Sequence, residues 1–528
     1  MAGSKSAARK SSSKARKKSN CTATMSTSTR TPEVGMPPAI PALVFDNRTA
    51  FDALHFDTVD QHDVAFHVIV ARTAYVLGPC GADGTATMTA LEEPARLNTA
   101  DRHYDDDTAR SVREESDLAP YKPLCDVIVV GDAHAPGTRA ARHFSVGLHV
   151  KRRDTQAPLP VKPLGLNPMQ GPSPAMIEQW EDEVRLARTT VVPGEVLLDK
   201  TLAVTGPRTL QKHYAPVRLA QWGIRFATLG LATPSPWRLT RPAPTLAVPL
   251  RYELAQGGEC RIGTSNPHAK RVPLKFRLAK SQAAMYPPDE APAALDACQF
   301  NPVGLGFARP WFLRATGNAS APAPQVAYPT RPFSATQFWH AAKGKAKLHP
   351  AGLGAVGRTW LPRRDWIGTF EEKTQWQADD IPRLPKDFDF RYWNCAPEDQ
   401  QCPHLRGEEI FTLINLCASD SPLARKDAEG NSILRFVLPA QSLCALGADT
   451  AGAVAVMPLA IDTVTIDLEA GQVHLTWRLC MLADGELPEV RLMHYDSAEQ
   501  LRRIDEWNEP ASGATPAGSR LPCASTPL

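Results

Sequence analysis

The sequence predicts a mainly β fold, with one or two antiparallel, sandwich-like units, long proline-rich loops and a few short helices. Forty-eight of the 528 residues are proline, which breaks helices and central strands but suits turns and edges. Short runs of β-branched and aromatic residues recur, and several alternate between apolar and polar side chains as half-buried strands do. The apolar fraction of 43% and the charged fraction of 22% are those of a globular protein.

The first predicted strand, residues 65–77, is rich in β-branched and aromatic side chains. Residues 125–131 form a short apolar run that ends in glycine, as a buried strand does. Three further segments have strand-like alternation, namely residues 143–150, 197–204 and 434–438.

A β-hairpin is predicted near the end of the chain, with residues 463–467 and 472–478 on either side of a turn at 468–471. Because successive side chains of a strand point to opposite faces, residues 472–478 divide into two sets. The inward set is predicted to be Val473, Leu475 and Trp477. The outward set is predicted to be Gln472, His474, Thr476 and Arg478.

Two helices are predicted. Residues 175–188 place Ile177, Trp180, Val184 and Leu186 at roughly helical spacing, and residues 497–509 open with a capping-box pattern. Composition divides the chain into a disordered basic tail (1–38), an N-terminal β-rich half (39–290), a Pro/Ala-rich linker or long loop (291–330), a C-terminal β-rich half (331–490) and a short helix with a loose tail (491–528). One domain and two domains both remain open.

Charge is uneven along the chain. The first 30 residues carry eight Lys/Arg and no Asp/Glu, so the net charge of +3 leaves 3 − 8 = −5 for the remainder. One interpretation of the tail is a solvated segment, or a wrongly assigned start codon with Met25 or Met36 as the true start. The other is a weak tether to nucleic acid or to an acidic partner. No apolar run is long enough to span a membrane, and no apolar stretch follows the basic N-terminus. Eleven cysteines without a regular framework then predict reduced thiols in the cytoplasm.

Motifs for catalysis, phosphate binding or metal binding are missing from the sequence. There is no G-x-S-x-G, H-E-x-x-H or G-x-x-x-x-G-K-[ST] pattern. The G-x-G-x-x-G at Gly352, Gly354 and Gly357 follows a proline rather than a strand. Cys395, Cys402 and His404 lack the tight pairing of structural zinc ligands. We therefore expect a non-enzyme without cofactor or metal.

Two nearby carboxylates provide the alternative hypothesis, a β-rich carbohydrate-active hydrolase. Asp387 and Asp389 share one face of an extended segment, and Glu371 would be a third carboxyl. In the competing interpretation, Asp387 and Asp389 pin a loop by bonding to backbone N–H groups and to Arg391.

Several motif blocks resemble a known family. Residues 115–123 (ESDLAPYKP) with 126–131 (DVIVVG) resemble the central signature of an uncharacterised-domain family of bacterial type VI secretion accessory proteins, encoded beside spike, PAAR and toxin genes. Similar blocks follow in order between residues 47 and 478, including WLPR at 360–363 and LPKDFD at 384–389. The family-motif residues, which are also candidate partner-binding residues, are Glu115, Ser116, Asp117, Tyr121, Lys122, Asp126, Trp360, Arg363, Trp366, Gly368, Thr369, Asp387 and Asp389.

The resemblance implies a non-catalytic adaptor or chaperone. Such a protein binds a toxic effector in the bacterial cytoplasm and brings it to a PAAR-type tip or a valine–glycine-repeat spike protein, with no membrane partner and no nucleic-acid contact beyond the basic tail. The mildly acidic body would suit a basic effector. A permanent component of the apparatus is a third possibility. Residues 151–195 and 211–245 look expanded relative to the family, and Ala50 and Gln256 depart from its usual proline and phenylalanine; the expansions are candidate partner-specific surfaces.

Overall fold

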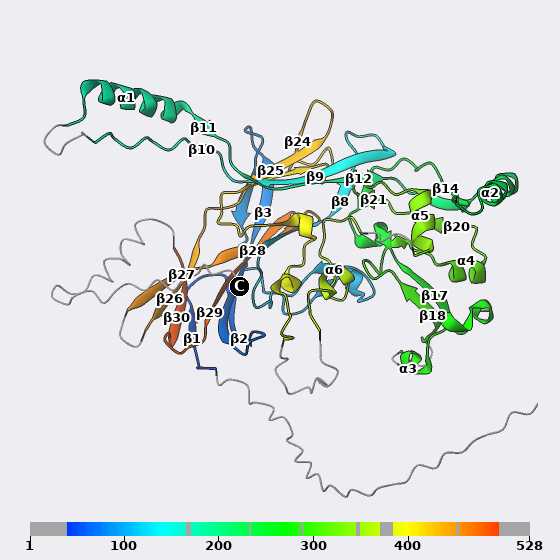
Figure 1. Cartoon of the computed structure of the whole chain (residues 1–528). Helices are drawn as coiled ribbons and strands as arrows, with labels where there is room; N and C mark the ends of the chain where they lie inside the picture. Colours follow the sequence, from blue (N-terminus) through cyan, green and yellow to red (C-terminus); the bar gives the residue numbers. More distant parts are fainter. Residues whose placement is uncertain are drawn as a thin grey trace, which may run out of the picture. The chain divides into compact units, whose positions relative to one another are not determined.

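The computed structural model describes residues 40–164, 171–231, 234–284, 286–287, 290–344, 349–369, 384–449 and 453–495 (Figure 1). All of them belong to one compact unit within Ala39–Leu528. The predicted tail 1–38, the predicted helix 497–509 and the candidate carboxyl Glu371 lie outside the described residues.

The largest sheet has seven strands and is mixed. Its order is β2-β3-β29-β28-β7-β22, with β4 paired to β3, and all neighbours are antiparallel except β28 and β7. Its strands are β2 (Asp52–Val59), β3 (Ala65–Cys80), β4 (Ala86–Ala90), β7 (Cys125–Val130), β22 (Gln401–Cys402), β28 (Ala460–Asp467) and β29 (Gln472–Leu482).

A six-stranded antiparallel sheet and a four-stranded sheet complete the larger core. The first has the order β21-β12-β9-β23-β25-β24, and the second has the order β1-β30-β26-β27 with β1 parallel to β30. Their strands are β9 (His143–Lys151), β12 (Val196–Thr205), β21 (Val326–Ala327), β23 (Ile410–Ile414), β24 (Arg425–Lys426) and β25 (Ser432–Val437), then β1 (Val44–Asn47), β26 (Leu443–Ala448), β27 (Val454–Pro458) and β30 (Glu489–His494).

One hydrophobic cluster joins these sheets in a sandwich-like arrangement. It contains Val127 and Leu475 from the seven-stranded sheet, Leu148 and Phe436 from the six-stranded sheet, and Leu492 from the four-stranded sheet. Burial of this many β-branched and aromatic side chains supplies the main driving force for folding. The prediction of a mainly β, sandwich-like fold is confirmed, with the correction that the seven-stranded and four-stranded sheets each contain one parallel strand pair.

A second hydrophobic cluster is built from the segment between β12 and β23. It includes Trp237, Ile262, Trp311 and Phe338. The elements around it are β13 (Thr209–Lys212), β14 (Trp237–Leu239), β20 (Ser320–Pro322), β17 (Glu259–Gly263), β18 (Pro292–Ala297), α4 (Pro310–Thr316) and α5 (Ala335–Ala342). Short two-stranded pairs complete the fold: β5 (Arg102–His103) with β6 (Val112–Glu114), β8 (Asp132–His134) with β15 (Ala247–Pro249), β10 (Thr155–Gln156) with β11 (Val191–Val192), and β16 (Gln256–Gly257) with β19 (Leu305–Gly306).

The predicted domain segments share these sheets and clusters. β3 from the N-terminal half pairs with β29 from the C-terminal half, and β9 pairs with β23 in the same way. Residues 291–330, expected as a linker or long loop, hold β18, β19, α4, β20 and β21.

The remaining helices are α1 (Pro174–Thr189), α2 (Ala215–Ala227), α3 (Lys280–Ala283) and α6 (Leu361–Arg364). The helix predicted over 175–188 is α1, which begins after the cap residue Ser173. Its Trp180 donates a hydrogen bond to the carbonyl of Pro160 at 2.9 Å. Leu186 is exposed, and the neighbouring Ala187 is the buried residue of this helix. None of the helices within the described ranges has the length and apolar character required to cross a bilayer.

Candidate functional site

The first family-motif block forms a loop that leads directly into β7, a central strand of the seven-stranded sheet. The side chains of Ser116, Asp117, Lys122 and Asp126 are buried. Such groups need partners inside the protein, because a buried charge without a partner costs several kcal/mol. The partners come from distant parts of the chain and form what we call the buried ion-pair network: Arg72, Glu114, Glu115, Asp117, Lys122, Asp126, Arg358, Arg363, Asp462 and Arg478.

Asp126 and Lys122 are the most enclosed pair of the network. Lys122 Nζ lies 2.8 Å from Asp126 Oδ2 and donates a second bond of 2.8 Å to Thr463 on β28. Asp126 also accepts bonds from the backbone N–H groups of Cys395 and Ala396 at 2.9 and 3.0 Å. Although burial favours the neutral amine, Asp126 raises the pKa of Lys122. The pair therefore ties β7, β28 and the segment at 395–396 together as charged groups.

Asp117 makes a similar connection to the largest sheet. Arg72 on β3 bonds to Asp117 at 2.9 Å and to Glu114 at 3.1 Å. Thr476 on β29 donates a hydrogen bond to Asp117 at 2.9 Å. The motif loop thus covers one face of the sheet with polar contacts.

Glu115 links the first motif block to the WLPR block. It accepts bonds from Arg358 and, at 2.9 Å, from Arg363, whose guanidinium also donates to the carbonyl of Tyr392. Burial opposes ionisation of Glu115, but Arg363 and Arg358 outweigh it and lower the pKa of Glu115 to about 2. Trp360 of the same block is buried edge-on against Tyr252, with ring centroids 5.2 Å apart.

The ionisation of Glu115 predicts acid sensitivity. A carboxyl whose pKa is lower in the folded state than its ordinary value of 4.5 contributes stability above that value, and the contribution is lost as pH falls toward about 2. We expect it to be on the order of 3 kcal/mol. Chemical denaturation between pH 7 and pH 2.5 should show a steeper loss of unfolding free energy in the wild type than in Glu115→Gln. Equal slopes would contradict the assignment, and Asp106→Asn, at an exposed carboxyl, is the control.

The network leaves no room for a substrate beside the motif residues. A cavity of about 20 Å³ is lined by its members, including Arg72, Glu115 and Lys122. That is space for one water molecule. Tyr121 is the exposed member of the first block, with its ring edge-on to Phe390. Tyr121 is therefore the residue of this block that is most accessible from solvent.

The candidate carboxylates Asp387 and Asp389 are bound within their own loop. Asp387 accepts hydrogen bonds from the backbone N–H and hydroxyl of Thr369, at 2.9 and 3.0 Å. Asp389 pairs with Arg391 and accepts a bond from its backbone N–H. The Thr369 bonds lower the pKa of Asp387, and the Arg391 side chain lowers that of Asp389. A glycosidase acid requires a raised pKa, so this geometry is that of loop-pinning groups.

Gly368 and Trp366 complete this loop. Gly368 has φ = +85°, and a Cβ atom there would lie 2.4 Å from Asp387 Oδ1, so the turn requires glycine. The Arg391 guanidinium stacks 3.5 Å above the half-buried Trp366 ring. The structure thus brings Trp366, Gly368, Thr369, Asp387 and Asp389 together at the surface.

We expect replacement of either carboxyl by an amide to have only a small effect on stability. Asp387→Asn and Asp389→Asn should each change the free energy of unfolding by less than about 1 kcal/mol, because exposed pairs are screened by solvent. The purified wild type and both variants should behave alike toward a panel of glycans, with no cleavage that depends on either carboxyl. Glycan cleavage that disappears in either variant would instead support the hydrolase hypothesis.

The cysteine-rich segment does not gather metal ligands. Cys395 lies 4.0 Å from Lys122 Nζ, Cys402 pairs with Cys125 in the β22–β7 register, and His404 bonds to the backbone carbonyl of Lys122. The nine cysteines in the described part of the chain are free thiols.

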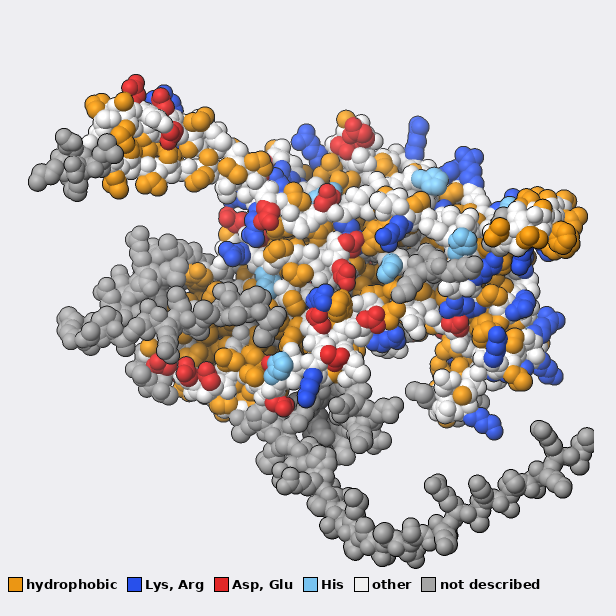
Figure 2. Space-filling model, viewed as in Figure 1, with side chains coloured by type: hydrophobic (Ala, Val, Ile, Leu, Met, Phe, Trp, Pro, Cys, Tyr) orange, Lys and Arg blue, Asp and Glu red, His pale blue; other side chains and the backbone are white. Residues whose placement is uncertain are grey.

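The most unusual surface is on α2, inside segment 211–245, which the sequence comparison led us to expect as a partner-specific surface. Every large apolar residue from Val217 to Leu231 is exposed. The helix contacts the rest of the protein through Gln221, whose side-chain amide donates a 2.9 Å hydrogen bond to the carbonyl of Ser235. Trp222 and Phe226 stack with centroids 5.9 Å apart. Figure 2 shows hydrophobic side chains gathered over this helix. We call the following residues the α2 surface: Val217, Leu219, Trp222, Ile224, Phe226, Leu229 and Leu231.

This orientation reverses the usual rule for a surface helix, which turns its apolar stripe to the core. Contiguous exposed apolar patches mark interaction sites. The sequence analysis did not predict α2, although Pro216 in its first turn and its apolar spacing are helix signals. The surroundings are basic, since residues 207–241 contain six Lys/Arg and no Asp/Glu.

In a comparison with protein families, the chain matches the model described as "Uncharacterized protein conserved in bacteria (DUF2169)" over residues 62–160 and 174–478. The match covers most of the chain. The chain belongs to this family. Searches of curated proteins and of solved structures find no match. The DUF2169 match contains both charged motif blocks and α2, so the buried ion-pair network and the α2 surface lie within the family region.

Proposed function

We propose that this DUF2169 protein is a non-catalytic adaptor of bacterial type VI secretion. It binds a toxic effector in the cytoplasm and helps to load it onto a PAAR-type tip or a valine–glycine-repeat spike protein. The resemblance of its motif blocks supplies the secretion context, and the α2 surface is the observation that supports protein binding.

The α2 surface suits recognition of a protein groove. Leu219, Trp222 and Phe226 lie on the face turned away from Gln221, and they are 70%, 64% and 74% exposed. An amphipathic helix that offers aromatic and aliphatic anchors at this spacing fits an apolar groove on a partner. Tryptophan and other large side chains of this kind carry most of the binding energy in interfaces.

Charge narrows the nature of the partner. Arg218 and Arg225 flank the apolar face, and Lys212, Arg238 and Arg241 lie nearby in the same acid-free segment. An apolar groove with an acidic rim is therefore the complementary surface. This local charge differs from the mildly acidic average of the whole body, so it favours an acidic docking segment over a basic one at this surface.

Co-expression with the products of neighbouring genes, especially spike-tip and toxin-like proteins, tests the proposal. The tagged chain should retain one toxin-like product in a stable complex and raise its soluble yield several-fold. Stoichiometry in purified spikes separates a loader from a permanent part, because a transient loader is absent from the finished spike. Failure to bind any neighbour, or stoichiometric presence in finished spikes, would overturn the adaptor proposal.

A further inference from the structure

Three side chains that could bind a metal ion converge at the edge of the seven-stranded sheet. His55 and Asp57 lie two residues apart on β2, so both point to the same face of the strand. The β2–β3 register places His67 directly opposite Asp57. β2 is an outer strand of this sheet. The three residues are far from the α2 surface in sequence and belong to neither family-motif block.

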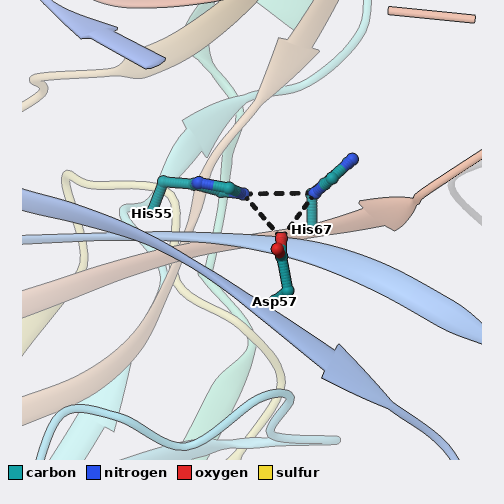
Figure 3. A group of neighbouring side chains, drawn as sticks. All are labelled: His55, Asp57 and His67. Atoms are coloured by element: carbon teal, nitrogen blue, oxygen red, sulfur yellow. Dashed lines mark hydrogen bonds and ion pairs between the residues drawn. The ribbon is translucent and has the colours of Figure 1, made fainter. Parts of the chain in front are cut away.

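The three potential ligand atoms form a small triangle (Figure 3). His67 Nδ1 lies 2.7 Å from Asp57 Oδ1, His55 Nε2 lies 3.1 Å from the same oxygen, and the two nitrogens are 3.2 Å apart. We compared the His, Cys, Asp and Glu side chains of the described residues. His55, Asp57 and His67 are the group of three whose possible ligand atoms all lie within 4.8 Å of one another. One ring nitrogen of each histidine faces the other, and the Asp57 carboxylate lies next to both nitrogens.

Two of these separations match the spacing of ligands around one ion, and the third, 2.7 Å between His67 Nδ1 and Asp57 Oδ1, is slightly shorter. Ligand atoms about 2.1 Å from a metal and 90–110° apart are about 2.9–3.4 Å from each other. The triangle fits within a circle of radius about 1.7 Å, so a point about 2.1 Å from all three atoms lies just outside their plane. The ligand atoms need little movement to bind an ion.

The contacts and exposure of Asp57 also suit a metal. His55 Nε2 and His67 Nδ1 both approach the same oxygen of Asp57. Without a metal, both imidazole N–H groups would donate to that one oxygen. The side chain of Asp57 is 41% exposed, which gives an ion entry from solvent and leaves room for water as a further ligand.

We propose that His55, Asp57 and His67 form a binding site for a divalent transition-metal ion of the zinc class. Two imidazoles and one carboxylate with an open position are a ligand set that such ions accept. Bound there, the ion joins the edge strand β2 to β3 and stabilises the edge of the sheet. The site is independent of the adaptor proposal, because its ligands lie outside the α2 surface.

Zinc binding by the full chain tests this site directly. The tag is removed, metals are stripped with a chelator, and Zn²⁺ is titrated calorimetrically, with Co²⁺ absorption as a second readout. One equivalent should bind, and Zn²⁺ should raise the Tm. The Co²⁺ spectrum should lack a thiolate charge-transfer band, since the ligands are nitrogen and oxygen. Asp57→Asn and His55→Gln should each weaken affinity by at least about tenfold.

The matched control is His62→Asn, an exposed histidine in the turn between β2 and β3, which should bind like the wild type. His67 is buried, so the two more accessible ligands carry the test, and circular dichroism of the metal-free variants verifies their fold. Absence of saturable binding overturns the proposal. So does one-equivalent binding that is unchanged in both Asp57→Asn and His55→Gln, because the ion would then be held by other histidines or thiols.

Discussion

Replacing Asp126 by alanine is expected to lower the free energy of unfolding by about 3–5 kcal/mol, the cost of leaving a buried charge without its partner. Asp126 is fully buried, and it pairs with Lys122 and accepts bonds from Asn394, Cys395 and Ala396. Its loss leaves the Lys122 ammonium without its counterion and the backbone N–H groups of Cys395 and Ala396 without their acceptor. Denaturant unfolding at pH 7 measures the change.

A double-mutant cycle isolates the Lys122–Asp126 interaction. Lys122→Met alone leaves the Asp126 carboxylate unpaired, Asp126→Leu alone leaves the Lys122 ammonium unpaired, and the two substitutions together remove both charges. The double variant should be more stable than the sum of the two single losses predicts, because neither residual charge is left buried. Strictly additive losses would show that the two groups do not interact. Asp389→Asn, in an exposed pair, serves as the surface control.

The second large effect is expected on partner binding. Replacing both Trp222 and Phe226 by alanine should weaken binding of the effector recovered by co-expression at least about 100-fold, because large aromatic anchors dominate interfaces. Stability should change by less than about 0.5 kcal/mol, since both side chains are exposed. Binding is measured by titration of the purified variant with the purified effector.

A measurement on the chain alone tests the same surface. The double variant should bind less of a fluorescent hydrophobic dye than the wild type, because its exposed aromatic surface is smaller. Leu186→Ala on α1, which also removes an exposed apolar side chain, is the matched control and should leave effector binding unchanged. Full effector affinity in the Trp222/Phe226 variant would place the interface elsewhere. If the wild type instead binds lipid vesicles through α2, the surface is a membrane contact and the protein-partner assignment fails.

The hairpin at the end of the chain illustrates how far local pattern reaches. Alternation correctly placed Val473, Leu475 and Trp477 in the core. The prediction that Thr476 and Arg478 face outward is wrong, because both are buried. They bond to Asp117 and to the Ala119 carbonyl of a loop more than 350 residues away in sequence. A strand's own residues do not show what covers its second face.

Candidate site residues show the same limit. The motif block at 115–126 was recognisable as a rigid, charged loop, but Arg72 and Arg358, which pair with its Asp117 and Glu115, lie in other segments of the chain. The α2 surface could not be predicted from the sequence, because its exposure depends on which side of the helix packs against the rest of the protein. The hydrogen bond from Gln221 to Ser235 shows that side. His55 and Asp57 share a face by strand periodicity alone, whereas His67 joins them through the β2–β3 register.

The sequence by itself determined the β-rich class, the main strands, α1 and the motif blocks, because strand and helix periodicity and proline content act over neighbouring residues. The tertiary structure decided which strands pair, which charges are neutralised in the interior, and which apolar helix face is left exposed. Those outcomes depend on contacts between residues hundreds of positions apart, such as β3 with β29 and Glu115 with Arg363. The free energy of burying a charge or an apolar face is set by those contacts and not by the local pattern.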